Sequence, residues 1–313
     1  MNDSPLNKQS RRFDVETIDR MSRENPDQLV DQAEQEYASA VKDTAEKYLS
    51  SRQKKKIILI SGPSASGKTI TSHLLTQELK EHGLNPVVVS LDNFYLDKEH
   101  QRRNPDGSIR YESVLSIDLS RINRALWSLI CRGEALIPQY DFITVRSDED
   151  RLLTLHTEDV LIVEGLHALN PLLTYGLDYD SFFKLCITTD SGFYSEDECI
   201  LSAEEVRFVR RAVRDRKHRG AEITMTCRMW PGVREGEQLY IRPFYLYADV
   251  LLNTVHSYEP LVYKAEILQM LGAVIEHPEY GAFASELYRR LLRFGELPAK
   301  KVPSSSMLQE FVG

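Results

Sequence analysis

The sequence predicts an α/β protein in which a parallel β-sheet is flanked by helices. Five short apolar runs rich in Val and Ile lack the polar alternation of a half-exposed strand. Helical or irregular stretches separate them, which is typical of crossover connections in a parallel sheet. The runs cover residues 57–60, 87–91, 160–163, 183–187 and 250–252. Because ligands of such sheets bind at the carboxyl ends of the strands, the residues after each run are the first candidates for a functional site.

The composition excludes several classes of protein. A chain of 313 residues, 42% of them hydrophobic, is long enough to bury a full core. Its net charge of −8 gives no overall attraction to DNA or RNA, so nucleic acid is not an expected partner. No apolar run approaches the roughly 20 residues that span a bilayer, and the polar N-terminus is unlike a secretory signal. We therefore expect a cytoplasmic protein with no membrane partner, whose four cysteines are free thiols because none forms a C-x-x-C pair.

The N-terminal region divides into a tail and a helix. Residues 1–24 are polar and aperiodic, which predicts a mobile tail. Asn25 and Pro26 then indicate an N-cap and a first helical position. Apolar residues follow at helical spacing as far as residue 50. They are Val30, Ala33, Tyr37, Val41, Ala45 and Tyr48. We interpret residues 25–54 as a helical extension that packs on the main domain rather than as a recognition helix.

The first apolar run leads directly into GPSASGKT, residues 62–69, which fits the pattern G-x-x-x-x-G-K-[ST] and precedes a helical stretch. Small residues let backbone N–H groups turn toward phosphate oxygens, and the helix N-terminus adds a partial positive charge. Lys68 can reach the β- and γ-phosphates, and the Thr69 hydroxyl can bind Mg²⁺. The sequence therefore predicts a nucleoside triphosphate site.

Acidic residues follow two further runs. Asp92, in SLDNFYLD, stands where a carboxylate could accept a proton from a substrate hydroxyl, bind Mg²⁺, or cap the following turn. Glu164, in DVLIVEGLHAL, stands at the equivalent edge, where a metal-binding carboxylate is expected. Lys68, Thr69, Asp92 and Glu164 would together supply one cation and three oxygen ligands around one crevice.

The stretch RRAVRDRKHRG, residues 210–220, is strongly basic within an acidic chain. Arg207, Arg211 and Arg214 are spaced to share one face of a helix. Such arginines could close over phosphates, or they could form an ordinary solvated face. A nucleic-acid role is disfavoured because no aromatic residues are interleaved with the charges.

These motifs, together with PQYDF, occur in the order and spacing of a known family. The chain resembles the uridine kinase (uridine–cytidine kinase) branch of the phosphoribulokinase/uridine kinase family over roughly residues 26–313. The stretches RMWPGVREGEQLYIRPF and PSSSMLQEFVG resemble a bacterial long-form subgroup. The resemblance implies a P-loop NTPase-type fold of the nucleoside kinase kind and ATP-dependent phosphoryl transfer to the 5′-hydroxyl of a ribonucleoside, with Mg²⁺.

The resemblance also assigns roles around the phosphates. Asp92 corresponds to the catalytic base and a Mg²⁺ neighbour, and Thr69 and Glu164 to metal ligands. Arg211, Arg214 and Arg219 correspond to the lid, so we expect Arg214→Ala to cripple phosphoryl transfer. Arg210, Arg216 and Lys217 are expected to face solvent, and Lys217→Ala to be nearly silent. The nucleotide-binding residues correspond to Gly62, Pro63, Ser64, Ala65, Ser66, Gly67, Lys68 and Thr69.

The acceptor side is assigned in the same way. Tyr95, Tyr140 and Phe142 correspond to residues that line a nucleoside pocket. Glu112 corresponds to an acidic residue that grips the ribose, where Arg211 also binds. The family's base-reading His is replaced by Val145, its acidic residue is one methylene longer as Glu112, and a further lid Arg is replaced by Ala221.

These departures leave alternatives open. One is a kinase of another hydroxylated acceptor such as a sugar phosphate, for which Arg146 could bind an anionic group. Another is a catalytically weakened nucleotide-binding regulatory protein. A GTPase switch is disfavoured because the sequence has no N-K-x-D motif, and the nearest stretch, NKQS at residues 7–10, lies in the N-terminal tail. Assembly into a homo-oligomer is also left open.

The expected domain organisation follows from these assignments. It is a mobile tail at 1–24, a helical extension at 25–54, a kinase domain at 55–258 with a lid at about 191–236, and a C-terminal helical extension at 259–313 packed on the kinase domain.

Overall fold

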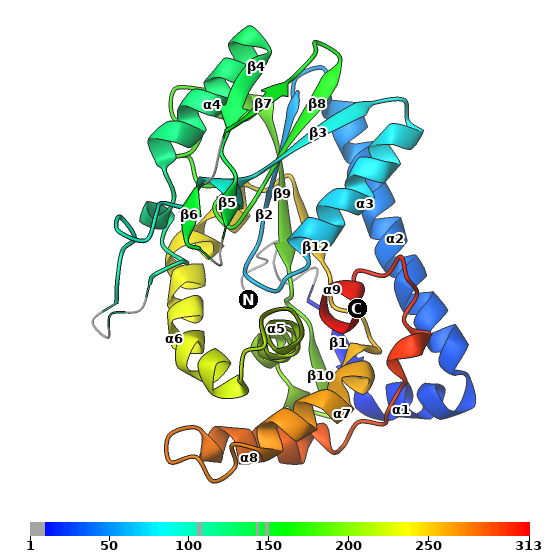
Figure 1. The fold of residues 1–313 in the computed structure, drawn as a ribbon. Helices are drawn as coiled ribbons and strands as arrows, with labels where there is room; N and C mark the ends of the chain where they lie inside the picture. Colours follow the sequence, from blue (N-terminus) through cyan, green and yellow to red (C-terminus); the bar gives the residue numbers. More distant parts are fainter. Residues whose placement is uncertain (1–9, 105–106, 108, 142–143, 148–149) are drawn as a thin grey trace.

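A five-stranded parallel sheet forms the centre of the protein, in the order β12-β9-β2-β8-β3 (Figure 1). The computed structural model describes residues 10–104, 107, 109–141, 144–147 and 150–313. The strands are β2 (Ile57–Ser61), β3 (Asn85–Ser90), β8 (Asp159–Glu164), β9 (Phe182–Thr188) and β12 (Val250–Asn253). Each contains one of the five apolar runs, except that Leu91 follows the end of β3, so the predicted parallel α/β fold is confirmed.

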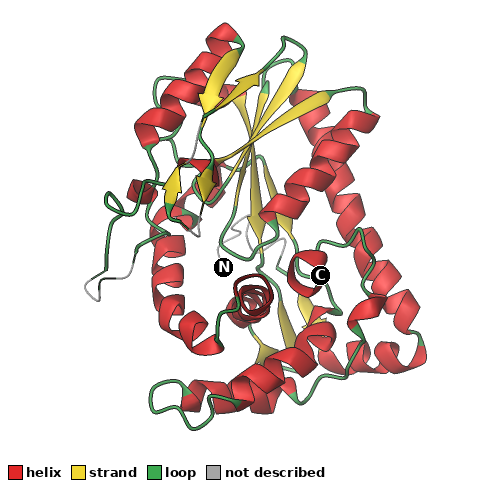
Figure 2. Ribbon diagram, in the orientation of Figure 1, coloured by secondary structure: helices red, strands yellow, loops and turns green. Residues whose placement is uncertain are grey.

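The sheet is buried on both faces. Ile58 and Ile60 of β2 belong to one hydrophobic cluster, and Ile57 and Leu59 belong to another. Successive side chains of a strand point to opposite faces, so a strand with a cluster on each side must be apolar throughout. Figure 2 shows helices on both sides of the sheet. This burial explains why the runs lack polar alternation.

Eight helices longer than one turn, and the short helix α9, are described around the sheet. They are α1 (Val15–Glu24), α2 (Pro26–Ser51), α3 (Lys68–Glu81), α4 (Leu119–Arg132), α5 (Ala203–Arg219), α6 (Ile223–Tyr240), α7 (Glu259–Gly272), α8 (Gly281–Leu291) and α9 (Gln309–Val312). None of those in the described part of the chain combines the length and apolar character that a membrane crossing needs.

Three small sheets accompany the central one. Strands β4 (Glu134–Ile137) and β7 (Arg151–Thr154) form an antiparallel pair, as do β5 (Tyr140–Asp141) and β6 (Arg146–Ser147). The third sheet has the order β1-β10-β11. Its strands are β1 (Arg12–Asp14), β10 (Gly192–Ser195) and β11 (Glu198–Leu201).

The third sheet corrects the expectation of a mobile tail. Residues 12–24 form β1 and α1, and only residues 1–9 of the expected tail lie outside the described residues. Phe13 stacks on Phe193 of β10 at a centroid distance of 5.1 Å, and Val15 and Ile18 are buried. The prediction was wrong because β1 pairs with a strand about 180 residues away in sequence, and no local pattern reveals such a partner.

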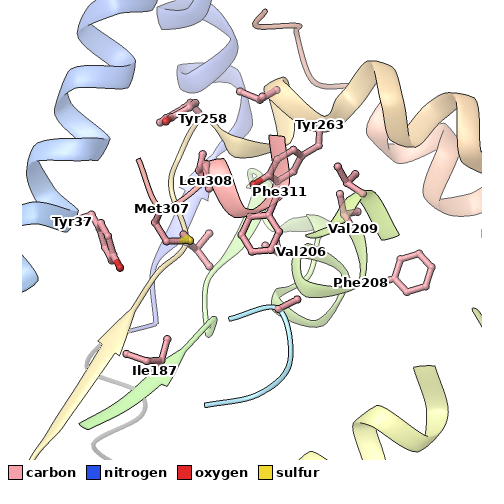
Figure 3. Packing of buried hydrophobic residues seen from close by; sticks show 14 of the residues in the cluster. Tyr37, Ile187, Val206, Phe208, Val209, Tyr258, Tyr263, Met307, Leu308 and Phe311 are labelled. Carbon is pink, nitrogen blue, oxygen red and sulfur yellow. The ribbon is translucent and has the colours of Figure 1, made fainter. Parts of the chain in front are cut away.

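Helix α2 begins at Pro26 as expected, although the side chain of Asn25 makes no capping hydrogen bond. Its predicted apolar stripe is buried, and one continuous cluster joins it to the sheet, α5 and the C-terminal residues. Figure 3 shows Met307, Leu308 and Phe311 of the C-terminal segment within this cluster. The division of the chain at residues 55 and 258, and the movement expected of a lid at 191–236, stay predictions.

Candidate active site

The predicted phosphate loop connects β2 to α3, with Gly67 at the N-cap of the helix. Gly67 has a φ of 86°, in the left-handed region that favours glycine. A Cβ on Gly62 would lie 2.7 Å from the Ile187 carbonyl oxygen, and one on Gly67 would lie 2.7 Å from Sδ of Met307. Gly62 is therefore required by its close approach to the backbone of β9, and Gly67 by its left-handed conformation.

Neighbouring segments hold the loop in place. The Thr254 hydroxyl, just after β12, donates to the Ser66 carbonyl at 2.7 Å. The Thr71 hydroxyl donates to the Gly67 carbonyl at 2.7 Å, and lies 2.7 Å from the Tyr37 hydroxyl of α2. The loop is thus supported from two sides, which preorganises its backbone N–H groups for an anion.

Lys68 is surrounded by carboxylates. Its Nζ donates to the Pro63 carbonyl at 3.0 Å, within the loop. Burial lowers the pKa of the Lys68 ammonium, and the negative charges of Glu164, Asp92, Glu310 and Glu112 oppose this effect in that order. An ammonium in such a position is available for an anionic ligand.

The two acidic residues lie at adjacent strand ends, as predicted. Asp92 lies in a short 3₁₀ turn after β3, and the residue that caps this turn is Ser90, whose hydroxyl accepts from the Asp92 N–H at 3.3 Å. Asp92 is therefore not the cap. Desolvation raises the pKa of the Asp92 carboxyl, whereas Lys68, Arg214 and Arg219 lower it. The carboxylate stands among cations at the opening of the crevice.

The donor set fits a magnesium ion. Glu164 ends β8 and is 6% exposed. Burial raises the pKa of its carboxyl, and the nearby charge of Asp92 raises it further. Two mutually repelling carboxylates are oxygen ligands of the kind that Mg²⁺ prefers, and a cation would relieve their repulsion. The hydroxyl of Thr69, exposed in the first turn of α3, is the third predicted oxygen ligand.

The three predicted lid arginines meet at one carboxylate. Asp215 of α5 is 5% exposed. Its oxygens lie 3.4 Å from Arg211 Nε, 3.4 Å from Arg214 Nη2 and 3.3 Å from Arg219 Nη1. Arg211 also donates to the Ser64 hydroxyl of the phosphate loop at 2.9 Å. The arginines therefore gather beside the loop, although they are not adjacent in sequence.

The other basic residues of the stretch 210–220 differ from one another in burial and in bonding partners. Arg210 was expected to face solvent, but it is fully buried, with Nε 2.7 Å from Oε2 of Glu259. The expectation was wrong because this face of α5 packs against α7, whose first residue supplies a matching carboxylate. Arg216 donates to Gln269, and the exposed Lys217 donates to the Val312 carbonyl at 2.6 Å. Lys217 is therefore bound to the C-terminal segment.

Three tyrosines gather on the predicted acceptor side. The ring of Tyr95 lies 5.8 Å from that of Tyr111 and 5.7 Å from that of Tyr140. Glu112 lies 3.7 Å from Arg211. Burial raises the pKa of the Glu112 carboxyl, while Arg211, Arg207 and Lys68 lower it. The Glu112 carboxylate thus interacts electrostatically with Arg211 and Lys68, two cations of the phosphate side.

The last acceptor-side positions lie on the β5–β6 turn. Phe142 lies outside the described residues. Val145 has a φ of 57°, which is uncommon for a β-branched residue. Its carbonyl accepts from the Lys98 N–H at 3.1 Å.

A cavity of about 560 Å³ opens beside Glu112, against α6, with apolar walls. Those walls include Met225, Met229, Pro231, Val233 and Tyr240.

Known proteins resemble the chain in the part that carries these residues. Residues 57–172 match the model of the Phosphoribulokinase / Uridine kinase family. A uridine kinase of Lactobacillus helveticus is 28% identical over 204 residues, which cover 64% of this chain and 87% of that protein. The chain is therefore similar to members of the phosphoribulokinase/uridine kinase family over this region. Uridine-cytidine kinase 2-B of Danio rerio is also 28% identical over 204 residues, covering 63% of this chain and 72% of its own length.

A solved structure is also similar. That of a possible uridine kinase from Bacillus stearothermophilus covers 69% of this chain and 98% of its own, with 17% identity and a TM-score of 0.48. The match to the family model and the uridine kinase relatives indicate a small-molecule kinase, an enzyme that transfers a phosphoryl group to a hydroxyl.

Sequence reasoning missed three residues of this kinase. Tyr111 precedes Glu112 directly, and its aromatic ring was a signal for the same pocket. Asp215 was the single acid among the basic residues, which was a signal for a shared partner. Glu310 lies near Lys68 through the fold of the C-terminal segment, and nothing in the sequence indicated this position.

Proposed function

We propose that this kinase transfers the γ-phosphoryl group of ATP, with Mg²⁺, to the 5′-hydroxyl of a ribonucleoside. The observation that carries the proposal is the convergence of Lys68, Asp92, Glu164 and the arginines around Asp215 at one edge of the sheet. Phosphoryl transfer depends mainly on positioning and on stabilising charge, which is what such a cluster supplies.

The phosphate-side residues have separate tasks. The loop N–H groups and Lys68 bind the phosphates, and Arg211, Arg214 and Arg219 stabilise charge on the transferring group. Thr69, Asp92 and Glu164 would hold Mg²⁺, which supplies charge neutralisation between the phosphates when it is bound. Asp92 takes the proton of the acceptor hydroxyl while that oxygen forms its bond to the γ-phosphorus and the bond to ADP breaks.

Two features support Asp92 as the proton acceptor. Desolvation raises the pKa of its carboxyl, which makes it a stronger base, and the cations Lys68, Arg214 and Arg219 favour its ionised form. The turn that carries Asp92 is capped by Ser90, so the Asp92 carboxylate is not used as the cap.

The acceptor would lie between the tyrosines and Glu112. Flat aromatic faces suit a nucleobase, and a carboxylate suits a ribose diol. A second candidate acceptor is another hydroxylated molecule such as a sugar phosphate, because the aliphatic side chain of Val145 cannot donate a hydrogen bond to a base.

The test is ADP release with Mg²⁺ and ATP against a panel of nucleosides, sugars and sugar phosphates. We expect acceptor-dependent ADP release with a nucleoside, lost in Asp92→Asn while ATP binding is retained. Glu99→Gln, on the exposed segment that follows, is the matched control and should keep full activity. Full activity of Asp92→Asn would contradict the assigned base, and a flat response across the panel would favour a nucleotide-binding regulatory protein.

A further inference from the structure

The C-terminal segment, residues 303–313, lies against the phosphate loop rather than at the periphery. Met307, Leu308 and Phe311 are fully buried, and Met307 packs directly on Gly67. Figure 3 shows these three side chains between Tyr258 and Tyr263 on one side and Val206 of α5 on the other. The segment is therefore a wall of the nucleotide site that the proposed function describes.

Both ends of this segment are anchored. The Ser306 hydroxyl donates to Oε1 of Glu34 on α2 at 2.6 Å. At the other end, Lys217 of α5 donates to the Val312 carbonyl at 2.6 Å, and His218 Nε2 lies 3.2 Å from the Glu310 carbonyl oxygen. Helix α5 thus holds the C-terminal turn through Lys217 and His218, which lie between Arg214 and Arg219 in sequence.

Glu310 extends from this last turn toward the phosphate-side cations. Its Oε1 lies 3.3 Å from Nη1 of Arg214. Its Oε2 is buried and has no hydrogen-bond partner among the described residues. Burial raises the pKa of Glu164, and the charges of Asp92 and Glu310 raise it further, so Glu310 is near the predicted metal ligands too.

A carboxylate in this position competes with phosphate. A guanidinium binds a carboxylate and a phosphate with the same donors, so Arg214 cannot give Nη1 fully to both. Glu310 also adds a fourth negative charge to Asp92, Glu112 and Glu164 around Lys68. The phosphates of a nucleotide would meet repulsion from Glu310 unless its carboxylate withdrew.

We propose that Glu310 is a residue of the nucleotide site that occupies Arg214 until the phosphates of ATP replace it, so that binding releases the C-terminal turn. This inference rests on the proposed function, which places the phosphates on Arg214. It assigns the C-terminal segment a part in setting nucleotide affinity. The opposite role, in which Glu310 holds Arg214 in its binding orientation, is the alternative outcome of the test.

The test compares ATP affinity, measured by titration calorimetry with Mg²⁺, in the full chain and in Glu310→Gln. We expect ATP to bind about fivefold more tightly to the variant, the factor that corresponds to the net contribution of one typical hydrogen bond no longer in competition. Glu296→Gln is the matched control, because Glu296 makes an exposed ion pair with Lys264 in the same region. Unchanged or weaker ATP binding in Glu310→Gln would overturn the proposal.

Two further measurements keep the proposal falsifiable if Glu310→Gln folds poorly. Lys217→Ala removes the hydrogen bond to Val312 without touching Arg214. Because of this contact, the variant should also tighten ATP binding, which replaces the sequence-based expectation that it would be nearly silent. In the unaltered protein, ATP with Mg²⁺ should accelerate amide hydrogen exchange over residues 309–313, and slower exchange there would refute the release of this turn. Lys68→Ala distinguishes a failure of the proposed role of Glu310 from a failure of the proposed function. If Lys68→Ala leaves ATP affinity unchanged, the assigned nucleotide site itself is wrong.

Discussion

Arg211 of helix α5 donates a hydrogen bond to the Ser64 hydroxyl of the phosphate loop, with an Nη1–Oγ distance of 2.9 Å. The same guanidinium lies 3.4 Å from Asp215 and 3.7 Å from Glu112. Arg211 thus joins the arginine helix, the phosphate loop and the acceptor side. Figure 1 shows α5 end-on beside this loop, between it and α7.

Removing this guanidinium should cripple the transfer. We expect Arg211→Ala to lower kcat by about 100-fold, because a preorganised donor to the transferring phosphoryl group is lost. Arg214→Ala should have an effect of similar size. Steady-state kinetics with the acceptor found in the panel measures both, and Arg216→Ala, which loses a contact to Gln269, is the control. Equal losses in all three variants would show that the helix acts only through its overall charge.

The buried pair of Arg210 and Glu259 should matter for stability rather than for chemistry. Arg210→Met leaves the Glu259 carboxylate buried without its partner, so we expect the free energy of unfolding to fall by about 3–5 kcal/mol in urea. Arg210→Met combined with Glu259→Met should recover most of this loss. Arg289→Met breaks an exposed pair with Glu286 and should leave stability nearly unchanged. A double variant as unstable as the single one would contradict this account.

The active-site carboxylates should make stability depend on pH. Burial raises the pKa of Glu164 above its ordinary value near 4.5, so the folded state binds this proton more readily than the unfolded chain does. The stabilising contribution is present below pH 4.5 and is lost as pH rises through the folded-state pKa.

Glu164→Gln should therefore raise the free energy of unfolding of the nucleotide-free protein at pH 7, by about 1 kcal/mol, while lowering activity. The gain should disappear toward pH 4. Thermal unfolding across this pH range measures the effect, and Glu158→Gln, whose side chain is 90% exposed, is the control. A gain that is the same at every pH would mean that Glu164 affects stability by another route.

The N-terminal residues should contribute to folding despite their polar sequence. Ile18→Ala removes a side chain that is 5% exposed, so we expect a loss of about 2–4 kcal/mol in the free energy of unfolding. Glu24→Ala, at an exposed position of the same helix, should be nearly neutral. Chemical denaturation of both variants provides the comparison. A silent Ile18→Ala would restore the expectation of a detached tail.

The sequence alone determined the parallel sheet and the phosphate loop. Both depend on short-range patterns: Val- and Ile-rich runs for strands buried on two faces, and the spacing of Gly62, Gly67 and Lys68 for a loop between a strand and a helix. The positions of Asp92 and Glu164 followed from the same rule, because the carboxyl ends of parallel strands share one edge.

Only the tertiary structure decided which charges face which partners. The partner of Arg210 is 49 residues away and that of Arg214 is 96 residues away, so spacing on α5 could not separate a buried cation from a phosphate-side one. The pairing of strand β1 and the position of Glu310 depend likewise on contacts between a terminal segment and a segment far away in the middle of the sequence. Local sequence carries propensity and periodicity, whereas burial and electrostatic pairing are set by the neighbours that the completed fold provides.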